Sequence, residues 1–162
     1  MAQLLVVEDN PDILHLIWTQ MRARGHQVLG ASSGPEALAA VEMWGPPQVA
    51  VLDVAMPSMD GLELLQQLRA ATGMQELPAI FLSAGVDRQT VEASHRLSAA
   101  YLAKPFMEEI LNAAIEAALA NGYQGLQAAV EAATPIEWSL HGRARDLPET
   151  AYHAASRYTT AP

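Results

Sequence analysis

The sequence predicts an α/β fold in which helices cover both faces of a five-stranded parallel sheet. The first observation is that residues 1–104 alternate between short apolar runs and stretches whose apolar residues recur at helical spacing. The second is that four of the five runs are continuously apolar, as is typical of strands buried on both faces. The third is that hydrophobic residues make up 51% of the 162 residues and charged residues only 17%, enough apolar material for a sizeable core.

The apolar runs predict where the strands lie. They span residues 4–7, 28–31, 49–52, 79–82 and 100–103. The second run contains Gly30 and is the least apolar of the five. We therefore expect it to form an edge strand, which is less completely buried than a central one.

Helix-start and helix-stop signals lie between the strands. Three starts combine a capping side chain with a proline or an acidic residue in the first turn: Asn10-Pro11, Ser33-Gly34-Pro35-Glu36 and Asp60-Gly61-Leu62-Glu63. Three glycines stand where these helices should stop: Gly25, Gly45 and Gly73. A fifth helix is expected to follow Pro105 and to run to about Asn121.

Polar residues follow the strands at the points where the strands end. Glu8 and Asp9 follow the first strand, Asp53 the third, Ser83 the fourth and Lys104 the fifth. In an open parallel sheet, ligands bind beyond the carboxyl ends of the strands, at the switch in strand order. The intervals between these residues fit a flavodoxin-like order, 2-1-3-4-5, which would place the first strand beside the third and Asp9 beside Asp53.

Three carboxylates in one crevice repel one another and raise each other's pKa. A hard divalent cation relieves this repulsion, and Mg²⁺ prefers oxygen ligands together with water and phosphate. Asp53 could then act as a nucleophile toward phosphorus. Lys104 would neutralise charge on the transferring group, and Ser83 would donate a hydrogen bond to one of its oxygens.

This arrangement resembles the receiver domain of two-component response regulators over residues 2–121. Five pieces carry the resemblance, in order: Val7-Glu8-Asp9-Asn10, Leu52-Asp53-Val54-Ala55-Met56-Pro57, Gly61, Leu82-Ser83-Ala84 and Tyr101-Leu102-Ala103-Lys104-Pro105-Phe106. The resemblance implies a signalling switch rather than an enzyme with a separate substrate. A partner histidine kinase or phosphotransfer protein would donate a phosphoryl group to the chain, and an unknown downstream protein would respond.

The resemblance also implies a role for each site residue. Asp53 would be the phosphoacceptor, and Ser83 and Lys104 would contact the phosphoryl group. The Mg²⁺ ligands would be Glu8, Asp9, Asp53 and the backbone carbonyl of Ala55. Tyr101 would be an aromatic switch that turns inward when Ser83 moves, and the Lys104–Pro105 bond would be cis.

Composition and motifs weigh against other functions. The net charge of −9 argues against a protein that coats nucleic acid or an anionic membrane. The absence of cysteine excludes disulfides, thiolate zinc sites and cysteine nucleophiles. No signal peptide or membrane span is apparent, so we expect a cytoplasmic protein. The alternative is a magnesium-dependent phosphohydrolase on a similar fold, but haloacid-dehalogenase-like enzymes carry a second aspartate where this chain has Ala55.

Residues 122–162 form a C-terminal extension with no recognisable output domain, beyond the receiver-like residues 1–121. Apolar residues continue at helical spacing from the fifth helix across Gly122 and Gly125: Leu111, Ile115, Leu119, Tyr123, Leu126, Val130 and Ala133. If the helix is continuous, a second copy of the chain could cover its stripe, and we expect a homodimer through the fifth helix or the extension. The alternative is a helix that ends near Asn121 with Gly122 as its cap, followed by a tail that folds back on its own domain. In either case Trp138 and the extension's tyrosines could anchor the tail.

Overall fold

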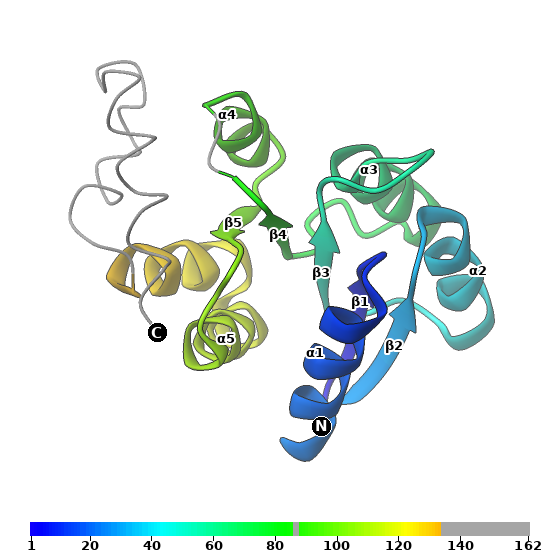
Figure 1. The fold of residues 1–162 in the computed structure, drawn as a ribbon, viewed down its shortest axis with the longest axis horizontal. Coiled ribbons are helices and arrows are strands. Elements are labelled where there is room, and N and C mark those ends of the chain that lie inside the picture. The colour runs from blue at the N-terminus through cyan, green and yellow to red at the C-terminus, as the bar shows by residue number, and fades with distance from the viewer. Residues whose placement is uncertain (86–87, 134–162) are drawn as a thin grey trace.

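Five parallel strands form one sheet in the order β2-β1-β3-β4-β5, as predicted (Figure 1). The structure is a computed structural model that describes residues 1–85 and 88–133. Strands and helices alternate along the chain: β1 (Gln3–Val7), α1 (Pro11–Ala23), β2 (Gln27–Ala31), α2 (Gly34–Trp44), β3 (Val49–Asp53), α3 (Gly61–Thr72), β4 (Ala79–Ser83), α4 (Arg88–Arg96), β5 (Ala100–Ala103) and α5 (Glu108–Ala133).

The predicted capping residues begin the first three helices. The Asn10 side chain accepts hydrogen bonds from the backbone N–H groups of Asp12 and Ile13. Ser33 and Asp60 cap α2 and α3 in the same way, each through the N–H three residues on. These bonds satisfy N–H groups that have no partner within the helix, which fixes where each helix starts.

Helices cover both faces of the sheet and enclose two apolar cores. On one face, Leu4 and Val6 of β1 pack with buried residues of α1 and α5. On the other face, Leu5 and Val7 pack with buried residues of α2 and α3. Alternate residues of one strand thus enter opposite cores, which explains why the central strands are apolar throughout. In contrast, β2 lies at the edge and keeps partly exposed positions, as its sequence predicted.

Helix α5 is not straight, and this corrects the expectation of a continuous apolar stripe. Asn121 and Gly122 have non-helical backbone angles, with φ +60° and ψ −144° at Gly122. The two parts of α5 therefore run in different directions (Figure 1). Residues 123–133, here called the fold-back helix, place Leu126 in the core of the same chain with no exposed surface. The structure thus combines the predicted helical extension with the alternative in which the chain folds back after Gly122.

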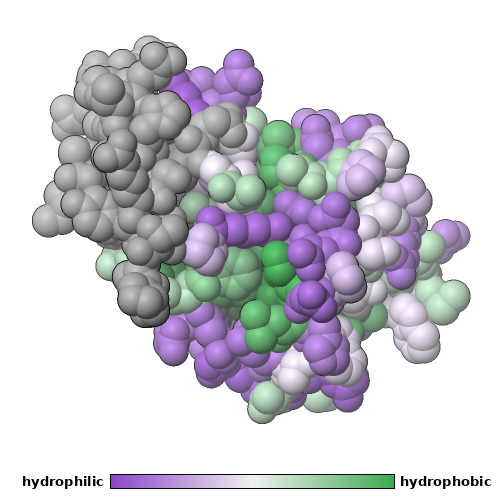
Figure 2. Space-filling view, viewed as in Figure 1, coloured by the Kyte–Doolittle hydropathy of each residue, from purple (hydrophilic) through white to green (hydrophobic). Residues whose placement is uncertain are grey.

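On the face drawn in Figure 2, hydrophilic residues cover most of the surface, and the hydrophobic colour gathers near the middle of the domain. Among the described residues, no helix is both long and apolar enough to cross a membrane. Trp138, Tyr152 and Tyr158, which could anchor the tail, lie outside the described residues.

Candidate functional site

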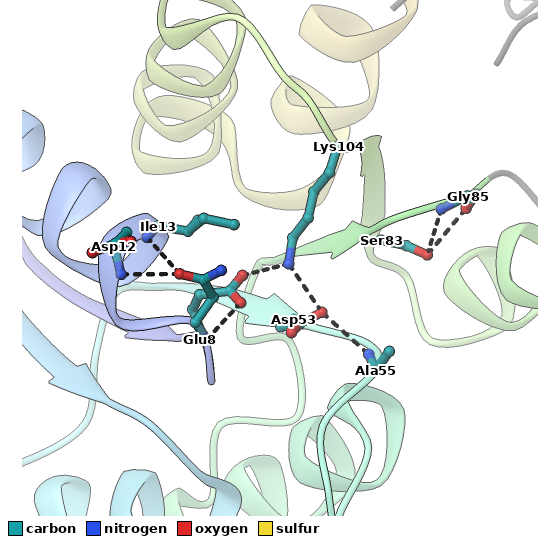
Figure 3. Close-up of polar contacts among 9 residues, drawn as sticks. Glu8, Asp12, Ile13, Asp53, Ala55, Ser83, Gly85 and Lys104 are labelled. Atoms are coloured by element: carbon teal, nitrogen blue, oxygen red, sulfur yellow. Dashed lines mark hydrogen bonds and ion pairs between the residues drawn. The ribbon is translucent and has the colours of Figure 1, made fainter.

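The polar residues predicted at the strand ends meet beyond the carboxyl ends of the strands. Glu8 and Asp9 begin the loop between β1 and α1, and Asp53 is the last residue of β3. β1 and β3 are hydrogen-bonded neighbours, with Val7 opposite Leu52, so the residues that follow them lie side by side. Lys104 follows β5 and extends from its loop toward the carboxylates (Figure 3). The Lys104–Pro105 peptide bond is cis, as the family resemblance implied.

Lys104 pairs with two buried carboxylates. Its Nζ lies 2.6 Å from Glu8 Oε2 and 3.4 Å from Asp53 Oδ1. The Glu8 side chain is fully buried, and its other oxygen accepts a hydrogen bond from the Asn10 backbone N–H at 3.1 Å. A buried carboxylate requires such partners because it has lost its hydration. The Lys104 ammonium therefore compensates the negative charge of the Glu8 and Asp53 carboxylates.

The environment of Asp53 opposes its ionisation. The Asp53 side chain is 3% exposed. Burial, reinforced by the negative charge of Glu8, raises the pKa of Asp53 from 3.8 to about 6, although Lys104 lowers it in part. At neutral pH the carboxylate is charged but stabilised less than it would be in water. The site therefore favours any cation or electrophile that relieves this charge.

Glu8, Asp9 and Asp53 can offer oxygen atoms to one cation. One carboxylate oxygen from each residue lies within 4.8 Å of the others. An all-oxygen donor set with one solvent-exposed member, Asp9, fits Mg²⁺, which retains several waters when bound. The backbone N–H of Ala55 donates to Asp53 Oδ1 at 3.2 Å, which orients the carboxylate. The ligand role of the Ala55 carbonyl stays a prediction.

Ser83 and Tyr101 converge on the carbonyl of Gly85, two residues after β4. The Ser83 hydroxyl donates to this oxygen at 3.0 Å, and the Tyr101 hydroxyl donates to the same oxygen from β5. Ser83 is buried, and like Asp53 it lies at the carboxyl end of its strand (Figure 3). The structure thus links the two residues predicted as a switch through one backbone acceptor, which the sequence did not reveal.

Gly61 supports the site in a way that the sequence analysis missed. It is the first residue of α3, and its N–H donates to the Val54 carbonyl at 3.1 Å. A Cβ atom at this position would lie 2.4 Å from the backbone oxygen of Asp53. Only glycine lets α3 begin this close to the end of β3. Its place in the motif was visible in the sequence, but its contact with Asp53 was not.

Comparison with known sequences agrees with this geometry. A profile of the response regulator receiver domain family matches residues 4–116. The transcriptional regulatory protein KdpE of Mycobacterium tuberculosis is 39% identical over 113 residues, which are 68% of this chain and 48% of KdpE. The chain thus spans about half the length of that relative. Protein PilH of Pseudomonas aeruginosa is 31% identical over 122 residues, 74% of this chain and 99% of PilH.

Solved structures share the fold. The Vibrio cholerae chemotaxis protein CheY4 superposes with a TM-score of 0.67 at 27% identity, covering 72% of this chain and 97% of CheY4. A response regulator described as putative, from Chloroflexus aurantiacus, gives a TM-score of 0.67 at 30% identity, covering 74% of this chain and 98% of the other. Both likenesses cover nearly the whole of the shorter protein and leave part of this chain's length unmatched.

Proposed function

The chain belongs to the response regulator receiver domain family, and on this premise we propose that it is a switch controlled by phosphorylation of Asp53. Receiver domains act in two-component signalling, where they accept phosphoryl groups from histidine kinases or phosphotransfer proteins. The donor of this chain is proposed to be such a protein, with Mg²⁺ held by Glu8, Asp9 and Asp53.

The observation that carries the proposal is the position of Asp53. Its carboxylate is buried at the end of β3, lies 3.4 Å from the Lys104 ammonium and shares a possible cation site with two other carboxylates. An acid with a structural role, such as Asp60, caps a helix through a backbone N–H. A carboxylate that is costly to ionise and faces the Lys104 ammonium is better explained by a reactive role.

The proposed chemistry is transfer of a phosphoryl group between two nucleophiles. An Asp53 oxygen forms a bond to phosphorus while the bond from phosphorus to the donor's imidazole nitrogen breaks, and the electron pair leaves with that nitrogen. The Lys104 ammonium offsets the negative charge that arrives, and the Ser83 hydroxyl can turn from the Gly85 carbonyl to a phosphoryl oxygen. Bound Mg²⁺ would supply further charge neutralisation on the phosphoryl oxygens. Hydrolysis of the acyl phosphate returns the carboxylate.

The proposal extends to partners in two ways. A downstream protein would read the phosphorylated state. We also propose that the chain forms a homodimer through the fifth helix or the extension. The apolar surface available for this contact is smaller than the predicted stripe, because Leu126 is already buried in the chain's own core.

A labelling experiment tests the phosphoacceptor. Full-length protein is incubated with acetyl phosphate and MgCl₂, and its intact mass is measured before and after mild acid treatment. We expect one acid-labile phosphoryl group per chain and none in Asp53→Asn, whose amide is nearly isosteric but a poor nucleophile. Asp12→Asn is the matched control, because it removes an exposed carboxylate from the nearby first turn of α1. Equal labelling of Asp53→Asn and wild type would refute the assignment.

The same preparation separates the switch from the alternative hydrolase. Turnover of p-nitrophenyl phosphate is followed with wild type and Asp53→Asn. A phosphohydrolase would release product over many cycles in an Asp53-dependent way. A receiver should show no more than its own slow dephosphorylation, since Ala55 stands where such hydrolases carry their second aspartate.

A further inference from the structure

The fold-back helix, residues 123–133, lies against the face formed by α4 and β5, where Tyr101 is found. We propose that this helix is a displaceable cover of the α4–β5 face, and that phosphorylation of Asp53 releases it. The inference rests on the proposed function for its trigger, but the cover itself is a feature of this chain. It makes residues 123–133 an internal ligand of the face through which the domain would contact a partner.

Two glycines permit the change of direction within α5. Gly122 combines φ +60° with ψ −144°, a backbone conformation open almost only to glycine. Gly125 comes so close to the first part of α5 that a Cβ atom would lie 2.3 Å from the Ala117 backbone oxygen. Neither glycine would be needed in a straight helix, where each costs roughly 1 kcal/mol relative to alanine. Their positions are explained by the fold-back.

The contact has one firm anchor and one loose region. Leu126 is fully buried and joins the same core as α1 and the first part of α5. Beside this anchor lies a cavity of about 70 Å³ between the helix and the face, partly open to solvent and lined by Val91, Ala99, Tyr101, Tyr123, Gln127 and Val130. Leu126 is the one buried residue of the fold-back helix, and its other residues are partly or fully exposed. Burial of so little surface indicates that the helix is held less firmly than the core elements of the domain.

A short path connects the phosphoacceptor to this cavity. Ser83 and Tyr101 both donate to the Gly85 carbonyl. When the Ser83 hydroxyl turns to a phosphoryl group on Asp53, this carbonyl loses the Ser83 donor, and we expect the hydrogen bond that Tyr101 donates to shift with it. Tyr101 is also a wall of the cavity under the fold-back helix. A change in its position would alter the cavity that Tyr101 lines together with Val130 and Tyr123.

The fold-back helix also indicates which kind of protein segment would compete with it for the α4–β5 face. The face now holds an amphipathic helix that inserts Leu126 and lays Val130 beside the apolar residues of α4 and β5. A downstream protein that docks there would present an amphipathic helix of its own. It would bind more tightly once residues 123–133 have left, because the fraction of open protein limits its apparent affinity.

Spin-label distances in the full-length chain test the cover directly. The protein has no cysteine, so Met43→Cys with Ala128→Cys gives two unique labelling sites. Met43 is 74% exposed near the end of α2, and Ala128 lies exposed on the fold-back helix. We expect one main distance without phosphodonor, and a second, broader population that rises about tenfold when acetyl phosphate and MgCl₂ are added. Intact mass measured on the same samples reports the phosphorylated fraction.

Variants at two neighbouring positions test displacement of the fold-back helix separately from phosphorylation. Gly125→Ala should populate the second distance without phosphodonor, because its methyl group collides with the Ala117 carbonyl. Gln124→Ala, an exposed position in the same turn, should keep the wild-type distance. A phosphorylated wild-type chain whose distances do not change overturns the inference and leaves the proposed function standing. A chain that takes up no phosphoryl group overturns both.

Discussion

Replacing Asp53 with asparagine should stabilise the protein at neutral pH in the absence of divalent metal. The pKa of Asp53 is raised from 3.8 to about 6, chiefly by burial and then by Glu8. The folded protein therefore holds the Asp53 proton more tightly than the unfolded chain does. For an acid shifted in this direction, the free energy of unfolding falls as the pH rises from about 4 to about 6.

The size of the effect follows from the shift. A rise of about two pKa units corresponds to about 3 kcal/mol, since each unit is worth roughly 1.4 kcal/mol. We take this as the upper value of the effect. Asp53→Asn removes the ionisation but retains an oxygen that can accept the Ala55 N–H bond. Its stability should exceed that of wild type by up to about 3 kcal/mol at pH 7.5 and should match it near pH 4.

Urea unfolding in EDTA, followed by circular dichroism at pH 4 and pH 7.5, measures the difference. For a chain of this size, 3 kcal/mol raises the urea midpoint by about 1.5 M if the slope is near 2 kcal/mol/M. Asp12→Asn is the control and should be unchanged or slightly less stable, because Asp12 is exposed in the first turn of α1. Adding MgCl₂ should stabilise wild type more than the variant. An Asp53→Asn protein that is no more stable than wild type at pH 7.5 would refute the electrostatic account of the site.

Three further predictions concern the neighbours of Asp53. Lys104→Met should lower the free energy of unfolding by about 3 kcal/mol in EDTA, because it leaves the buried Glu8 carboxylate without its cation, and MgCl₂ should restore part of the loss. A Glu8→Ala/Asp9→Ala double variant should show no heat of Mg²⁺ binding by titration calorimetry, and retained affinity would contradict the metal assignment. Gly61→Ala should destabilise the protein by about 1–3 kcal/mol and slow the phosphorylation of Asp53, because the new methyl group collides with the Asp53 backbone carbonyl. Unchanged labelling kinetics would show that this contact does not position the Asp53 carboxylate.

The sequence alone predicts the sheet and the position of the site. Strands buried on both faces need continuous apolar runs, so these runs located the strands to within one residue at each end. The strand order placed the residues after β1 and β3 together, which made Glu8, Asp9 and Asp53 neighbours before any side chain was seen. The starts of α1, α2 and α3 were equally accessible, because caps such as Asn10 act through bonds within a few residues.

Contacts between distant segments required the tertiary structure. Arg69 is an example: it is 9% exposed, and it donates to the backbone carbonyls of Leu77, Leu97 and Ser98. No spacing pattern in the sequence reveals such a bond, because its acceptors are backbone atoms that every residue carries.

The path of the chain after Asn121 was decided in the same way. Apolar residues continue at helical spacing through Leu126, a pattern that a straight helix covered by a second copy and a bent helix covered by its own domain both satisfy. The choice depends on the space around Gly122 and Gly125, where one backbone conformation and one close approach to Ala117 permit the bend. Periodicity reports which residues of a helix seek burial, but only the packing of the whole chain determines which surface buries them.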